Sequence, residues 1–413
     1  MSRFLLTSWL SGFRRVRMKT FQPPLKVLWA AALLAGTTAL AQSQARAPAK
    51  PSHALRTLPL TKFYETPNPL PAGKAGELIR FEPFDDYLLP YETSAFRILY
   101  HSRSPNGEDV PVSGVVLLPD GTPPAAGWPV IAWAHDFTGS AQQCAPSLLK
   151  NLNEGPLLSM YVGLGYAVVA SDYAGLGTKV PHAALDTRSN AVDVINAVSA
   201  ARAALPQLGS KWVAAGYAQG SLVAVGVAEA ESEFGDPNYL GAISISGLAE
   251  PKESFEHLAQ GPSYYMIVFL ARGVKTVYSE FRIEEMLADK GIRLYEYVSH
   301  ACDANSGAVP PANEMLKPDW QNNRYVKEFF ARNMLGGKPA FGPLLLISGE
   351  SDTHVSSALA ATTVARLCEQ RDRVLFVKYP ALNASTVLGN SVSEQVSWIR
   401  ARFSGLPAPD NCP

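Results

Sequence analysis

The segment with the clearest chemical signature is 216–220, Gly-Tyr-Ala-Gln-Gly, which joins an apolar run at 212–216 to a helix-like stretch at 219–232. A strand that turns sharply into a helix between two glycines is the arrangement that exposes a nucleophilic serine. The glycines are needed because the turn is strained and a Cβ would clash with the neighbouring strand and helix. The central residue here is Ala218, which has no hydroxyl and cannot attack a carbonyl. The scaffold of an acyl-transfer site is therefore present without its nucleophile.

The histidine inventory bears on the base that such a site needs. The chain order of this kind of site is serine, then acid, then histidine. Asp352 follows an apolar run and a glycine, which makes it the candidate acid. The histidines are His53, His101, His135, His182, His257, His300 and His354. Only His354 follows Asp352, and at two residues' distance it cannot easily lie between that acid and a nucleophile on another strand. The sequence therefore lacks the base as well.

Composition limits the class of protein. Of 413 residues, 47% are hydrophobic and 17% charged, which is typical of a globular protein and excludes a disordered chain, a collagen and a coiled coil. Residues 1–41 carry six basic side chains and no acidic one, and removing them leaves 30 basic against 36 acidic side chains. A mildly acidic chain without a basic cluster predicts no nucleic-acid partner. No CxxC spacing exists, and we expect neither a metal nor an organic cofactor.

The first 41 residues have the pattern of an export signal. A basic start precedes an apolar run at 27–41, which is short for a membrane span and ends in Ala39-Leu40-Ala41. We expect cleavage near Ala41, which would give an exported protein (periplasmic or secreted) without a stable membrane span in the mature chain. Met18 is an alternative start of the chain. The alternative interpretation of the segment is an uncleaved N-terminal anchor. Four cysteines in an oxidising compartment suggest two disulfides, with three pairings open.

Short apolar runs alternate with helical patterns along the rest of the chain. Residues 42–75 are rich in Pro, Ala and Ser and predict a flexible leader. Strands are expected at 95–101, 110–118, 129–134, 166–171, 212–216, 242–246, 343–348 and 374–379, and helices at 187–204, 219–232, 356–370 and 389–403. Near-continuous apolar strands alternating with helices predict an α/β protein with a mostly parallel sheet and helices on both faces. Residues 250–338 are aromatic-rich and strandless, which indicates a helical insertion.

Several motifs together resemble the secretory-lipase branch of the α/β-hydrolases, from about residue 75 onward. They are Trp-Ala-His-Asp-Phe-Thr-Gly at 133–139, Cys-Ala-Pro-Ser at 144–147, Asp-Tyr-Ala-Gly-Leu-Gly at 172–177, Gly-Glu-Ser-Asp at 349–352 and Tyr-Pro-Ala-Leu-Asn-Ala at 379–384. In the last, relatives read roughly Tyr-Pro-Gly-x-Asp-His. The resemblance implies an α/β-hydrolase fold whose core, 76–249 and 339–413, is interrupted by a helical cap at 250–338.

The same resemblance assigns the site residues. It places the triad at Ala218 (nucleophile position, lost), Asp352 (acid) and Ala384 (base position, lost). It places the oxyanion donors at Gln219 and Asp136, although a carboxylate there would oppose developing negative charge. It implies an apolar pocket under the cap, bordered also by His135, Tyr217, Asp172 and Tyr173.

The resemblance also implies the disulfides Cys144–Cys302 and Cys368–Cys412. Each should add roughly 3–4 kcal/mol of stability by restricting the unfolded chain.

Three functions compete at this stage. The first is an exported, catalytically silent binder of an apolar or ester ligand, favoured because serine and histidine are missing together. The second is an active lipase or carboxylic ester hydrolase, or an engineered inactive form of one. The third is an interaction module whose cap contacts another protein. Nothing in the sequence predicts an oligomeric state.

Overall fold

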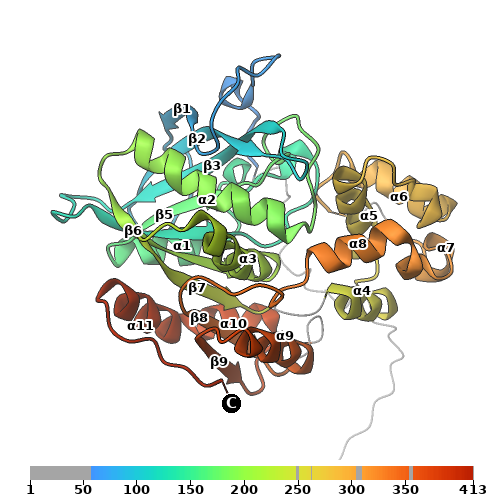
Figure 1. Ribbon diagram of the computed structural model, residues 1–413. Helices are drawn as coiled ribbons and strands as arrows, with labels where there is room; N and C mark the ends of the chain where they lie inside the picture. Colours follow the sequence, from blue (N-terminus) through green and yellow to red (C-terminus); the bar gives the residue numbers. More distant parts are fainter. Residues whose placement is uncertain (1–56, 248–250, 262, 304–308, 353–356, 413) are drawn as a thin grey trace, which may run out of the picture. The chain divides into compact units, whose positions relative to one another are not determined.

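The computed structural model describes residues 57–247, 251–261, 263–303, 309–352 and 357–412, which contain one nine-stranded sheet in the order β1-β2-β3-β5-β4-β6-β7-β8-β9 (Figure 1). The strands are β1 (Leu78–Pro83), β2 (Ser94–Arg103), β3 (Asp109–Leu118), β4 (Trp128–Ala134), β5 (Ala167–Ser171), β6 (Leu208–Tyr217), β7 (Tyr239–Ile245), β8 (Leu344–Gly349) and β9 (Val374–Tyr379). Pairing is antiparallel from β1 to β5 and parallel from β5 through β4 to β9. The carboxyl ends of the parallel strands therefore meet at one edge, where such sheets bind ligands.

Helices cover both faces of the sheet. Alternate residues of the central strands enter two separate hydrophobic clusters, Ala132 and Ala214 on one face and Ile131 and Val213 on the other. The first face is covered by α2 (Thr187–Ala204), α3 (Gln219–Phe234) and α9 (Ser357–Glu369), and the second by α1 (Gly155–Gly163), α10 (Ala384–Asn390) and α11 (Val392–Phe403). Strands buried on both sides explain why the sequence shows continuous apolar runs.

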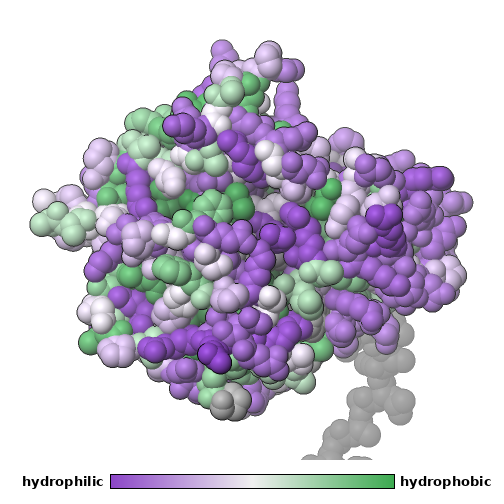
Figure 2. Space-filling model, viewed as in Figure 1, coloured by the Kyte–Doolittle hydropathy of each residue, from purple (hydrophilic) through white to green (hydrophobic). Residues whose placement is uncertain are grey.

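The chain between β7 and β8 is helical. It contains α4 (Pro251–Gln260), α5 (Met266–Val277), α6 (Asp289–Val298), α7 (Ala312–Met315) and α8 (Arg324–Arg332), and its described residues form one isolated bridge, Leu287–Leu316, but no strand. The helices enclose a third cluster that includes Phe269, Phe281 and Phe329. Figure 2 shows the outer surface of this insertion, at the right, as almost entirely hydrophilic. Within the described part of the chain, none of the helices combines the length and apolar character that a membrane crossing requires.

The expected strands and the mostly parallel sheet are confirmed, with three differences. Strand β1 and helix α1 were missed. The helix expected at 389–403 is α11, which begins at Val392, and the short helix α10 before it was not expected. Residues 57–75 are not a loose leader, because Phe63 and Tyr64 are buried against the core. The expected signal peptide at 1–41 lies outside the described residues.

Both expected disulfides are present. Cys144 is bonded to Cys302 across 158 residues of chain, and Cys368 is bonded to Cys412 across 44. The first joins the loop after β4 to the helical insertion, and the second joins α9 to the C-terminal tail. No free cysteine remains.

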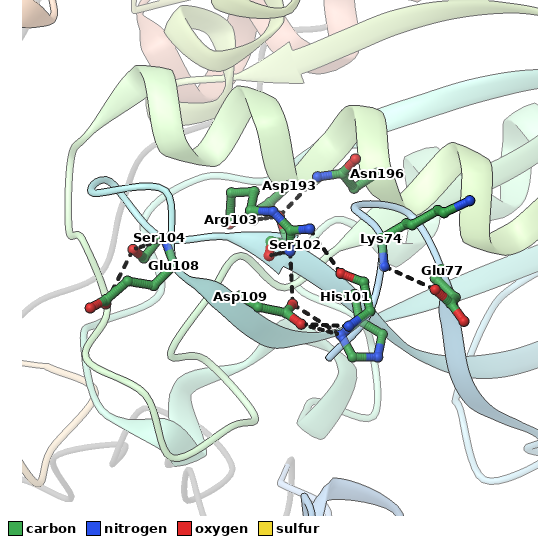
Figure 3. A network of polar contacts seen from close by, with 11 residues as sticks. Lys74, Glu77, His101, Ser102, Arg103, Ser104, Glu108, Asp109, Asp193 and Asn196 are labelled. Carbon is green, nitrogen blue, oxygen red and sulfur yellow. Dashed lines mark hydrogen bonds and ion pairs between the residues drawn. The ribbon is translucent and has the colours of Figure 1, made fainter. Parts of the chain in front are cut away.

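A buried polar network fixes α2 against the sheet (Figure 3). The Ser102 hydroxyl of β2 donates to the Asp193 carboxylate at 2.5 Å and accepts from the Asn196 amide at 3.0 Å. Beside it, His101 and Asp109 pair across β2 and β3 at 3.0 Å. Asp193 and Asn196 both belong to α2, so the network sets the position of that helix relative to the strands.

Candidate functional site

Ala218 lies at the turn between β6 and α3 in a strained conformation, with φ 48° and ψ −110°. Such backbone geometry costs of order 1–3 kcal/mol for a non-glycine residue. The two flanking glycines are required by contact. A Cβ on Gly216 would lie 2.0 Å from the Gly220 carbonyl oxygen, and one on Gly220 would lie 1.9 Å from that of Ala134. The expectation that a side chain at either glycine would clash is confirmed.

Four loops at the carboxyl edge of the sheet border one cavity of about 540 Å³, which is lined by Ala218, Asp136, Asp352 and Ala384 among others. The Tyr217 hydroxyl donates to the Ala384 carbonyl at 3.1 Å, which joins the start of α10 to the elbow. The three positions that the resemblance assigned to a triad therefore border one cavity. The volume of this cavity lies within the ~300–1,000 Å³ range of small-molecule sites.

Ser246, a residue that the sequence did not single out, orients the Asp352 carboxyl. It follows β7, has φ 48°, and its hydroxyl donates to Asp352 Oδ2 at 2.9 Å. Asp352 is 8% exposed and lines the cavity. A serine just after an apolar strand carries no sequence signal that separates this role from an ordinary turn.

The Asp136 side chain occupies the place where an oxyanion would be expected. Its Oδ1 accepts from the Phe137 N–H at 2.6 Å and from the Gln219 N–H at 3.3 Å. Backbone N–H groups at such a turn would otherwise point at the oxygen of a ligand carbonyl. A carboxylate oxygen of the chain itself therefore accepts from the Gln219 N–H, one of the two donors that the resemblance assigned to a ligand; the Phe137 N–H was not among those donors.

Three of the expected pocket residues, His135, Asp172 and Tyr173, do not line this cavity. They lie behind it. His135 is 2% exposed, its ring stacks on Tyr173 at 4.1 Å, and its nitrogens face the backbone carbonyls of Asp136 and Asp172. Burial lowers the pKa of His135 to about 4, although the two carbonyls act in the opposite direction. Its imidazole is thus enclosed by protein and not available as a base to a ligand in the cavity.

None of the histidines in the described part of the chain lines this cavity. Burial also lowers the pKa of His182 to about 4, and its Nδ1 lies 2.8 Å from the Ala174 carbonyl. His354 lies outside the described residues. Within the described ranges, no cluster of His, Cys, Asp or Glu side chains could hold a metal ion.

A buried carboxyl group lies behind Asp136. Glu154 is 7% exposed, and its carboxyl accepts from the Trp133 Nε1–H at 3.4 Å and the Asn153 amide at 2.5 Å. Burial first, and the nearby charge of Asp136 second, raise the pKa of Glu154 to about 8. The group is therefore mostly protonated at neutral pH. No motif in the sequence marks it, because its environment is created only by folding.

Glu154→Gln should raise stability at alkaline pH. A carboxyl group whose pKa is higher in the folded protein contributes stability that is complete below the unfolded pKa of about 4.3 and is lost as pH rises through the folded value. Glutamine keeps the neutral form at every pH. We expect the variant to exceed the parent in unfolding free energy at pH 9 by about 1–3 kcal/mol, and by less at pH 5.

Urea unfolding at the two pH values measures this difference. Glu65→Gln, at an exposed position, is the matched control and should show no such trend. A Glu154→Gln effect that is the same at both pH values would contradict the prediction.

The fold and the cavity at the strand-to-helix elbow are those of an α/β-hydrolase. A family model described as secretory lipase matches residues 152–411. The chain belongs to the secretory lipase family. Membership and the two disulfides fit an exported protein. No curated protein sequence matches the chain.

Solved structures of low sequence identity share the fold. The closed state of Candida antarctica lipase A is 18% identical, covers 85% of this chain and 88% of its own, and gives a TM-score of 0.74. The rice cell wall degrading esterase LipA from Xanthomonas oryzae is 19% identical in sequence. Its match covers 80% of this chain and 98% of the esterase, with a TM-score of 0.66. A putative hydrolase from Legionella pneumophila is 20% identical in sequence. Its match covers 79% of this chain and 98% of the hydrolase, with a TM-score of 0.69.

Proposed function

We propose that this protein is an exported, catalytically silent member of the secretory lipase family that binds an apolar or ester ligand in the cavity at Ala218. In this proposal the signal peptide is cleaved near Ala41. Ala218 and Ala384 stand where a nucleophile and a base would act, and Asp352 is the remaining acid. The mature chain needs no metal or cofactor for binding.

The observation that carries the proposal is the strained alanine. Ala218 is held at φ 48° between glycines that leave no room for a Cβ, in a turn whose use elsewhere is to present a reactive hydroxyl. An alanine gains nothing chemical from that conformation. Retained strain without a nucleophile is what a binding protein derived from an enzyme would show.

The Asp136 carboxylate supports the same proposal. With its Oδ1 bonded to the Phe137 and Gln219 N–H groups, a developing negative charge at that place would meet a charge of the same sign. A ligand carbonyl could still be accommodated in the cavity as a neutral group, because binding does not require the charge that hydrolysis develops.

The unmodified chain should bind methyl octanoate and hydrolyse p-nitrophenyl octanoate at or near background. Ala218 offers no attacking group, and a remnant oxyanion site alone is worth only roughly 10³- to 10⁴-fold over water, far below a complete triad. Calorimetry measures the first result and p-nitrophenol release the second.

The matched control is Asp352→Ala. If turnover of the unmodified chain is strong and survives Asp352→Ala, the proposal is wrong and the chemistry lies elsewhere. Strong turnover that is lost in Asp352→Ala would instead favour the second candidate, an active ester hydrolase. Membership in the secretory lipase family and the Ser246–Asp352 contact support that candidate.

A further inference from the structure

The cavity extends along α3 from the elbow to the first turn of α2. Gln219 lines it at the elbow, and Thr187 and Asn190 of α2 line it further along. The two helices meet closely at Gly226, where a Cβ would lie 2.9 Å from Thr187 Cγ2. Seven residues separate Gln219 from Gly226, which places the start of α2 about 10 Å along the helix from the elbow.

Two amide side chains that border the cavity have buried atoms without a hydrogen-bond partner. Asn190 is 1% exposed, and within the described part of the chain its Nδ2 has no partner; the same holds for Nε2 and Oε1 of Gln219. Buried amide groups in native proteins are almost always bonded, so each of these needs a partner.

A third amide of the same wall shows the contrast. The Asn333 Oδ1 accepts from the Thr187 N–H at 2.7 Å, and its Nδ2 donates to the Phe329 carbonyl at 2.9 Å. Asn333 is thus used to build the wall, whereas Asn190 retains an unused donor beside the cavity.

Asn190 is held in place from behind. One turn further along α2, Asp193 accepts from Ser102 of β2 (Figure 3). It also accepts from the Ala174 N–H at 2.8 Å. Because these buried contacts fix the helix, the Asn190 side chain keeps its place in the cavity wall, which limits the cost of ordering when a ligand binds.

The charges around the cavity select against an anion. Among the described residues that line it, the titratable acids are Asp136 and Asp352, and none is Lys, Arg or His. Much of the remaining wall is apolar, including Phe137, Leu222, Phe255, Met266 and Phe329. A free carboxylate in this cavity would lose its hydration and gain no cation.

We propose that Asn190 determines ligand specificity, and that the cavity takes an uncharged ester whose chain carries a hydroxyl or carbonyl oxygen able to accept a hydrogen bond from the Asn190 amide. Such a ligand is preferred over a plain alkyl ester and over a free fatty acid. The proposal rests on the proposed function, which supplies the ester-binding cavity at Ala218. It adds the residue that would donate a hydrogen bond to the chain of the ligand.

Three probes of equal chain length test this with the unmodified protein: methyl octanoate, methyl 8-hydroxyoctanoate and sodium octanoate. By calorimetry, we expect the hydroxy ester to bind about 5- to 10-fold more tightly than methyl octanoate, as one added hydrogen bond implies. Sodium octanoate should bind at least about 10-fold more weakly than methyl octanoate.

Variants identify the residue. Asn190→Leu should abolish the preference for the hydroxy ester, so that the two esters bind this variant with equal affinity. Asn190→Ala removes the amide without added bulk and replaces the leucine variant if that one does not fold. Asn106→Leu, at an exposed position in the turn between β2 and β3, is the matched control and should keep the preference.

The outcomes separate the two proposals. If methyl octanoate binds but the hydroxy ester binds no more tightly, or sodium octanoate binds equally well, or the folded Asn190 variants keep the preference, the role of Asn190 is wrong and the proposed function stands. If no probe binds, the proposed function fails, and the specificity proposal fails with it.

Discussion

Ala218→Ser combined with Ala384→His should raise hydrolysis of p-nitrophenyl octanoate at least about 10²-fold over the unmodified chain, while each single change has little effect. An unactivated serine is a poor nucleophile at neutral pH, and a histidine without a nucleophile has nothing to deprotonate. The cavity already brings positions 218, 352 and 384 together, and the Tyr217–Ala384 contact holds the third beside the elbow. The gain should therefore depend on both residues being present.

Adding Asp352→Ala to the double variant is the control, because the acid should matter only once the histidine is there. Its loss should remove most of the restored rate. A double variant no faster than the single ones would show that positions 218 and 384 are not a nucleophile and base pair, even though they border one cavity.

A third change should add to the rate of that double variant. Asp136→Gly removes the carboxylate that now accepts the Phe137 and Gln219 N–H groups, and leaves these donors to a substrate oxygen. Loss of a single oxyanion donor typically costs about 10²- to 10³-fold in turnover, so restoring access could be a large effect. If Asp136→Gly lowers the rate instead, the carboxylate has a supporting role in the site.

The sequence was sufficient for eight of the nine strands of the described sheet, because strands buried on both faces read as apolar runs, but it missed β1. It was sufficient for the elbow because its glycines are forced by contact. The sequence did not predict the burial and the contacts of individual polar side chains, because these arise only on folding. His135 was expected at the pocket, yet its ring lies behind the loop, against Tyr173. Asn190 was one polar residue in a predicted helix, and nothing in 187–204 shows that its amide would be buried without a partner beside a cavity.

Helix α10 was not expected, although the break that follows it lies at Gly389-Asn390-Ser391, residue types that favour turns and helix ends. In the structure, Ser391 ends one helix and precedes the next, and its hydroxyl donates back to the Val387 carbonyl at 2.7 Å. On either side of this break, Val387 of α10 and Trp398 of α11 pack in the same hydrophobic cluster against the sheet.

Replacing both cysteines of the Cys144–Cys302 bridge by serine should lower the unfolding free energy by up to about 5 kcal/mol. The bridge closes a loop of 158 residues, and restriction of the unfolded chain grows with the logarithm of loop length. Cys144 is also buried, 2% exposed, so serine would place a hydroxyl in an apolar setting.

The second bridge is the matched comparison. Cys368–Cys412 closes 44 residues, so its double serine variant should lose about 1 kcal/mol less in the same urea titration. Because Cys302 belongs to the helical insertion and Cys144 to the loop after β4, we also expect only the first variant to weaken methyl octanoate binding. Equal losses of stability and binding in the two variants would mean that the insertion is held over the cavity by its packing and not by the disulfide.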